Sequence, residues 1–164
     1  MIYINGNEYK YEKNKKICEY IDAPYAVCCL INNAVRPLDT VPSDGQSIQL
    51  LDVNSRGGFF CYRQSLILMF LTAVHAVFGK AACTVRHSIG KTTYCEVELA
   101  PDMRAGAGKK IYSYMRRMHK AALPIERINV SPDEAALIFE REGDMRSAEA
   151  MRCIARKSVN LYKI

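Results

Sequence analysis

Hydrophobic and polar residues alternate along much of residues 1–55, which predicts short β-strands. The first two alternating segments lie on either side of Asn5-Gly6, a dipeptide that adopts positive φ easily and favours a hairpin turn. A short helix is expected next, followed by three more strands separated by turns. These expected elements are the helix 15–21, the strands 25–31, 34–38 and 47–53, and the turns Asn32-Asn33 and Ser43-Asp44-Gly45.

The pattern changes after residue 55, where longer apolar periodicities predict helices. The most hydrophobic stretch, 66–78, lies within an expected buried core helix over 60–78. A hairpin turning at Gly90-Lys91 follows, with Tyr94, Glu96 and Glu98 on one face and Cys95, Val97 and Leu99 on the other. Ser131 and Glu134 form a capping box, which marks a helix start. The remaining expected elements are the helices 109–121, 131–142 and 146–157 and the strands 125–130 and 158–162.

These elements predict an α+β protein of two domains. A hairpin, a short helix and further strands within 1–55 are typical of a β-grasp, a small ubiquitin-like sheet over one helix, although other small α+β folds show the same order. Residues 1–55 hold five Lys/Arg and seven Asp/Glu, a net charge of −2. Residues 56–164 hold 18 Lys/Arg and 10 Asp/Glu, a net charge of +8. Because this step coincides with Ser55-Arg56-Gly57-Gly58, we expect a break there and domains over 1–55 and 56–164.

Several classes of function are not expected. Gly90-Lys91-Thr92 resembles part of a phosphate-binding loop, but Val85 stands where that loop needs its first glycine. The seven cysteines are odd in number, lack metal-ligand spacing and read as reduced thiols in a cytoplasmic protein. The three histidines are too scattered to form a metal site, so none is expected. The stretch 66–78 is too short to cross a membrane, and no signal peptide is expected.

Two groups of residues are candidate sites. His87, Ser88, Tyr94 and Cys95 lie on the hairpin around Gly90 and are expected to line a cleft. A His/Cys pair can act as base and nucleophile, but no third orienting group accompanies it, so no catalytic residue is predicted.

The second group is basic. Residues 103–125 contain six Lys/Arg and no acid, the charge pattern of a protein that binds phosphate-rich partners. Tyr112 and Tyr114 lie among these cations and can stack on bases, while a solvated helix face with Tyr114 in the core is the alternative. The predicted anion or RNA face consists of Arg104, Lys109, Lys110, Arg116, Arg117 and Lys120.

The order of short segments resembles a known arrangement of two domains. Residues 26–33 with Asp44-Gly45 and Leu50-Leu51-Asp52 resemble a TGS domain, the ubiquitin-like module that begins threonyl-tRNA synthetases. Residues 60–164 resemble the second N-terminal domain of those synthetases, in a form similar to that of bacterial uridine kinase-like proteins of the phosphoribulokinase/uridine kinase family. The segments that carry this second resemblance are 62–66, 87–89, 94–96, 123–127 and 139–143.

The resemblance implies an accessory region without catalysis of its own. Gln64 and Leu68 stand where the editing domains of synthetases carry two histidines, so no editing hydrolase is expected. The favoured hypothesis is a regulatory or ligand-sensing region of a uridine kinase-like enzyme. ATP and magnesium would then belong to a C-terminal kinase domain of the same polypeptide, outside this chain. The alternative is an RNA- or tRNA-binding module related to synthetase N-termini. A small ligand or RNA is a further expected partner, and no binding to a membrane is expected.

Overall fold

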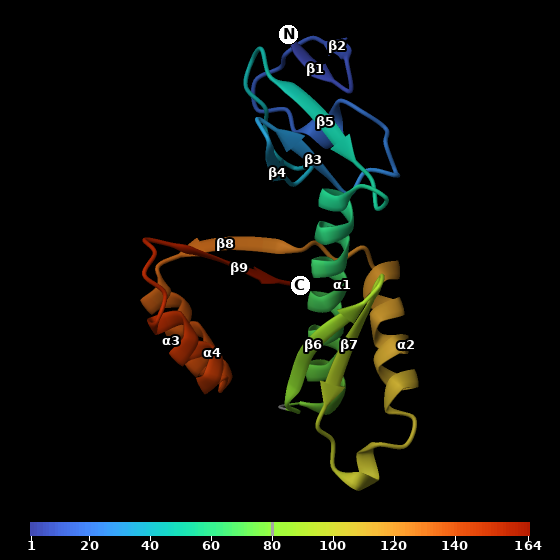
Figure 1. The fold of residues 1–164 in the computed structure, drawn as a ribbon, viewed down its shortest axis with the longest axis vertical. Coiled ribbons are helices and arrows are strands. Elements are labelled where there is room, and N and C mark those ends of the chain that lie inside the picture. The colour runs from blue at the N-terminus through green and yellow to red at the C-terminus, as the bar shows by residue number, and fades with distance from the viewer. Residues whose placement is uncertain (80) are drawn as a thin grey trace. The chain divides into compact units, whose positions relative to one another are not determined.

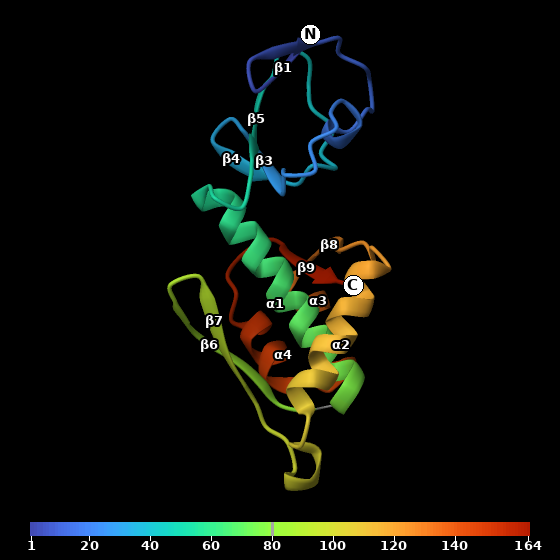
Figure 2. The same cartoon turned by 90° about the vertical axis from the view of Figure 1, so that its right-hand side faces the viewer.

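The computed structural model describes residues 1–79 and 81–164, which form two compact units (Figures 1 and 2). The first unit is Met1–Leu66 and the second is Ile67–Ile164. One long helix, α1 (Arg56–Phe78), contributes residues to both. The protein is therefore α+β, as predicted, with a mixed five-stranded sheet and two separate hairpins.

The first unit is a mixed sheet with the strand order β2-β1-β5-β3-β4. Strands β1 and β5 pair in parallel, and the other neighbours are antiparallel. Alternation sends Ile2, Ile4 and Ile48 to one face, where they pack into a core with Ile17, Cys29 and Ile31. The strands are β1 (Ile2–Ile4), β2 (Asn7–Tyr9), β3 (Cys28–Ile31), β4 (Ala34–Arg36) and β5 (Ser47–Leu51).

The turns of this unit match the prediction, but its helix does not. Asn5 and Gly6 have φ of 48° and 84°, Asn32 and Asn33 have 50° and 59°, and Gly45 has 80° in a turn with Asp44, so the three predicted turns are confirmed. The helix predicted over 15–21 is wrong in extent, since only a 3₁₀ turn, η1 (Ile17–Glu19), forms. The reason is non-local, because the N–H groups of Ile17 and Cys18 donate to the carbonyls of Thr40 and Leu38.

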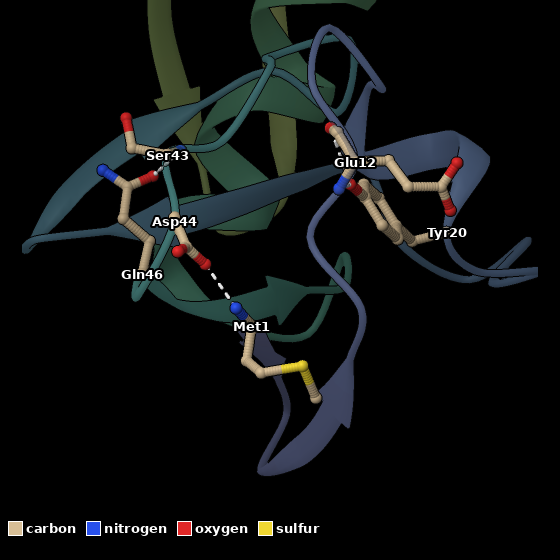
Figure 3. A network of polar contacts seen from close by, with 6 residues as sticks. All are labelled: Met1, Glu12, Tyr20, Ser43, Asp44 and Gln46. Atoms are coloured by element: carbon tan, nitrogen blue, oxygen red, sulfur yellow. Dashed lines mark hydrogen bonds and ion pairs between the residues drawn. The ribbon is translucent and has the colours of Figure 1, made fainter.

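Polar contacts close the loops of the first unit (Figure 3). The N-terminal amine of Met1 pairs with Asp44, and Gln46 Oε1 accepts the N–H of Ser43 at 2.8 Å. The Tyr20 hydroxyl accepts the N–H of Glu12 at 2.8 Å and lies 3.1 Å from its carbonyl oxygen. The contacts of Met1 and Gln46 lie just before β1 and β5, and that of Tyr20 joins the segments before and after η1.

Helix α1 begins where a break was predicted. Ser55 Oγ accepts the N–H of Gly58 at 3.1 Å, and its carbonyl accepts that of Phe59 at 2.8 Å. Ser55 thus caps the helix, and the Gly57-Gly58 pair lies inside it. The break predicted at 55–58 is wrong in this respect, and the helix starts four residues earlier than expected. The domain boundary after residue 55 stays a prediction.

Helix α1 is less buried than predicted. Ala73 and Val74 are fully buried, but most of the helix is half-buried or exposed. The argument that 66–78 is too short to span a membrane does not apply to a helix of 23 residues. Among the described residues α1 alone is long and apolar enough to cross one. One such helix is weak support for a membrane span, because the core helix of a soluble protein passes the same test.

The second unit packs the C-terminal half of α1 against a hairpin and a helix. The hairpin is β6 (Cys83–Ile89) and β7 (Thr92–Val97), and the helix is α2 (Ala107–Lys120). A 3₁₀ turn, η2 (Pro101–Met103), lies between them. Ala73, Val74 and Ile111 form the buried centre of this core, with Phe70, Phe78, Cys83, Val97, Tyr114 and Met115 around it.

The rest of the second unit is a two-stranded antiparallel sheet whose strands are joined by two short helices. Strands β8 (Glu126–Val130) and β9 (Val159–Lys163) are antiparallel, and α3 (Pro132–Glu142) has the predicted Ser131–Glu134 capping box. Helix α4 (Met145–Arg152) ends five residues before the prediction. After α4 the chain turns and β9 pairs with β8. Between these two strands, Asn129 Nδ2 donates to Asn160 Oδ1 at 2.9 Å.

Candidate nucleic-acid interface

Helix α2 positions most of the predicted basic residues. It begins after Gly106, whose φ of 71° suits glycine, and its buried side carries Ile111 and Met118. Tyr114 and Met115 are half-buried beside them, as the 3.6-residue period predicts. The opposite side is open to solvent.

Five cations cover this open side of α2, and we call them the basic face. Lys109, Arg116 and Lys120 lie at i, i+7 and i+11, almost opposite Ile111 on the helix. None of the five forms an ion pair with another described residue. Their charge is therefore available to an outside partner. The basic face consists of Lys109, Lys110, Arg116, Arg117 and Lys120.

Arg104 is the one predicted member that lies apart. It precedes α2, at the end of η2, and its Nε donates to the carbonyl of Leu99 at 3.0 Å. This bond ties the turn to the segment after β7, whereas the five helix cations form no hydrogen bond or ion pair through their side chains in the described part of the chain.

A shallow hollow of about 410 Å³ lies on the basic face. Tyr112 is 62% exposed at its edge, whereas the ring of Tyr114 points into the core and is covered by the Arg117 guanidinium at 4.9 Å. Only Tyr112 of the two predicted stacking tyrosines is therefore open to a ligand. The hollow is lined by Tyr112, Ser113, Arg116, Arg117 and Lys120.

The hairpin residues predicted to line a cleft divide between two faces. A bulge between Val85 and Ser88 places His87 against Tyr94, with ring centroids 5.4 Å apart. Cys95 faces the other way, toward the side of Cys83, because successive strand residues alternate. Ser88 lies opposite Thr93, near the tip. The structure thus joins His87 with Tyr94 and separates both from Cys95.

The thiols near the hairpin are not activated. Burial raises the pKa of Cys95, and burial followed by the nearby Cys95 thiol raises that of Cys83. A thiol with a raised pKa stays protonated at neutral pH and is a poor nucleophile. Among residues 1–79 and 81–164, no three His, Cys, Asp or Glu side chains gather in the way that a metal ion requires. Gln64 and Leu68, at the positions of the synthetase histidines, both lie on α1.

A second hollow, of about 530 Å³, lies at the start of α1 and was not predicted. Its walls are mostly apolar and carry two arginines seven residues apart, which places them on one side of the helix. The sequence gives little indication of this hollow, because two phenylalanines, Phe59 and Phe60, after two glycines are equally typical of the buried start of a helix. The lining residues are Val35, Arg56, Gly57, Phe59, Phe60 and Arg63.

Comparison with known proteins shows distant similarity to the N-terminal region of threonine–tRNA ligases. The chain is 27% identical to that of Nitratidesulfovibrio vulgaris over 140 residues, which are 84% of this chain and 21% of the ligase. It is 28% identical to the threonine–tRNA ligase of Syntrophotalea carbinolica over 150 residues, which cover 86% of this chain and 22% of the ligase. It is 24% identical to the threonine–tRNA ligase of Magnetococcus marinus over 166 residues, which cover 96% of this chain and 26% of the ligase.

The chain spans about a fifth to a quarter of the length of these curated relatives. No family model matches it. The similarity supports the synthetase part of the predicted resemblance, and it does not show the uridine kinase part.

Proposed function

We propose that this chain is an RNA-contacting module related to the N-terminal region of threonyl-tRNA synthetases, and that it holds RNA phosphates on the basic face of α2. The observation that carries the proposal is the set of five exposed cations on one side of a helix without ion-pair partners among the described residues. Clustered cations of this kind bind polyanions because displaced counterions gain entropy. The distant similarity to threonine–tRNA ligases makes RNA the polyanion that fits best.

The finer assignment of the fold is part of the proposal. The five-stranded mixed sheet, with its first and last strands paired in parallel, supports a TGS-like β-grasp in the first unit, although η1 is shorter than a β-grasp helix. The second unit would then correspond to the second N-terminal domain of the synthetases. Residues 1–55 carry a net charge of −2 and residues 56–164 one of +8, so we assign the RNA contact to the second unit.

The kinase hypothesis receives less support than this alternative. The relatives reported above are threonine–tRNA ligases, and similarity to them favours the RNA-binding interpretation. The C-terminal kinase domain, ATP and magnesium therefore stay predictions from the resemblance alone. A cytoplasmic location is consistent with a synthetase-like region but also stays a prediction.

The test is the salt dependence of RNA binding. Fluorescence anisotropy with a labelled tRNA, at salt concentrations from 50 to 200 mM, gives the slope of log K against log salt. Each phosphate contact contributes about 0.7 to 0.9 to this slope. We expect the triple variant Lys109→Glu, Arg116→Glu, Lys120→Glu to bind at least about tenfold more weakly and to lose about 2 to 3 from the slope.

A matched charge reversal elsewhere serves as the control. Lys10→Glu, Lys13→Glu and Arg36→Glu change the net charge by the same amount on the exposed surface of the first unit. This control should keep the wild-type slope. Equal losses in both triple variants would show that net charge, and not the basic face, governs binding, and no binding by the wild type would refute the proposed function.

A further inference from the structure

The hollow on the basic face has a feature that phosphate binding alone does not need, an exposed aromatic ring between cations. We infer that this hollow is a subsite for one unpaired RNA base, which stacks on Tyr112 while Arg116 and Lys120 hold the neighbouring phosphates. The inference rests on the proposed function and adds the class of RNA to it, namely RNA with single-stranded nucleotides.

The position of Tyr112 separates it from the core tyrosine two residues away. Tyr114 contributes its ring to the core around Ile111 and Val74, and Arg117 covers what remains. Within residues 1–79 and 81–164, Tyr112 makes no hydrogen bond or ring contact, and it is 62% exposed on a helix whose other exposed residues are mostly polar. A ring that is mostly exposed offers surface on which a planar ligand can stack.

The spacing of the cations around Tyr112 fits a strand of nucleotides. Lys109 lies three residues before Tyr112 and Arg116 four residues after it, so both are its neighbours on the helix surface. Lys120 follows one turn beyond Arg116. At 1.5 Å per residue, these cations extend over roughly 16 Å along the helix, enough for several consecutive phosphates.

Stacking on Tyr112 selects unpaired bases. In an RNA duplex the neighbouring bases cover both faces of each base. A tyrosine outside the duplex therefore reaches only phosphates and sugars. In a single strand a base can turn onto the ring while its flanking phosphates stay on the cations. The shallow hollow between Tyr112 and Lys120 is open to solvent, which suits a base that stacks on one ring face while the strand runs on along the cations.

The test compares two RNAs and two substitutions in the full chain. The probes are a labelled single-stranded pyrimidine 10-mer and a fully paired RNA duplex of 10 base pairs. We expect Tyr112→Leu to weaken binding of the single strand roughly 5- to 100-fold and to change duplex binding less than twofold. Tyr112→Phe, which keeps the ring, should bind the single strand within about threefold of the wild type. Circular dichroism checks that all variants are folded.

Tyr25→Leu is the matched control, because Tyr25 is a similarly exposed tyrosine, at 56%, in the first unit. It should leave binding of both probes unchanged. Single-strand binding that survives Tyr112→Leu, or that weakens equally for the duplex, would overturn the base subsite while leaving the basic face intact. Failure of the wild type to bind either probe would refute the proposed function itself, and the two failures are therefore distinguishable.

Discussion

Cys28 and Cys29 are adjacent in β3, and both are buried. Burial, followed by a hydrogen bond with the Cys61 thiol, raises the pKa of Cys28 to about 12. Burial raises the pKa of Cys29 to about 11, against a smaller opposing effect of Arg36, and its Sγ donates to the Arg36 carbonyl at 3.4 Å. Both side chains therefore behave as small hydrophobic groups that remain protonated at neutral pH.

The cysteines should consequently differ in their rates of alkylation. With iodoacetamide at pH 8, we expect the exposed Cys18 and Cys153 to react first and Cys28 at least about a thousandfold more slowly, because few thiolates form when the pKa is near 12. Peptide mass spectrometry over time measures each rate. Denaturant serves as the control and should equalise the rates, whereas fast labelling of native Cys28 would contradict the burial described here.

At the scale of the element, the start of α1 depends on one close approach. A Cβ added at Gly58 would lie 1.9 Å from the carbonyl oxygen of Asp52. The Asp52 side chain accepts the N–H groups of Asn54 and Ser55, which holds that carbonyl in place. The hydrogen bond from Asn54, followed by that from Ser55, lowers the pKa of Asp52. Gly58 is thus required for contact within the helix cap, and not for a flexible link.

We expect Gly58→Ala to destabilise the first unit by about 2 to 4 kcal/mol, since the backbone of the cap must shift to accept a methyl group. Urea unfolding followed by circular dichroism measures the change in free energy. Gly108→Ala in α2 is the matched control, because nothing lies within 4 Å of its added Cβ, and it should stabilise by about 0.5 kcal/mol. A neutral Gly58→Ala would mean that the cap is looser than described.

At the scale of the whole molecule, each compact unit has its own core. The first is built on Ile2, Ile4 and Ile48, and the second on Ala73, Val74 and Ile111. The two cores share no residue, although α1 contributes to both units. The excess of positive charge lies after residue 55, with a net −2 over residues 1–55 and +8 over residues 56–164. The stability of each unit is therefore expected to depend on its own core, and phosphate binding is expected to depend on the second unit.

Cavity-forming substitutions should act within their own unit. Ile48→Ala is expected to cost about 2 to 4 kcal/mol and to speed amide exchange in β1, β3 and β5. Val74→Ala should speed exchange in the second half of α1 and in α2, at a cost of about 1 to 2 kcal/mol. Hydrogen–deuterium exchange with peptide mass spectrometry distinguishes the two patterns. Faster exchange in both units from either substitution would show that the cores unfold together.

The sequence by itself determined the features that depend on neighbours along the chain. The Asn5-Gly6 turn, the Ser131–Glu134 capping box and the buried side of α2 all follow from residues within four positions of one another. The charge of the basic face was visible for the same reason.

Only the tertiary structure decided the features that depend on distant groups. The expected helix became η1 because the N–H groups of Ile17 and Cys18 bond to the carbonyls of Thr40 and Leu38. The pairing of β6 with β7 brought His87 against Tyr94, and packing in the core around Val74 covered Tyr114 while Tyr112 stayed exposed. Periodicity shows which residues share a side of an element, but contacts across the fold decide which of them a ligand can reach.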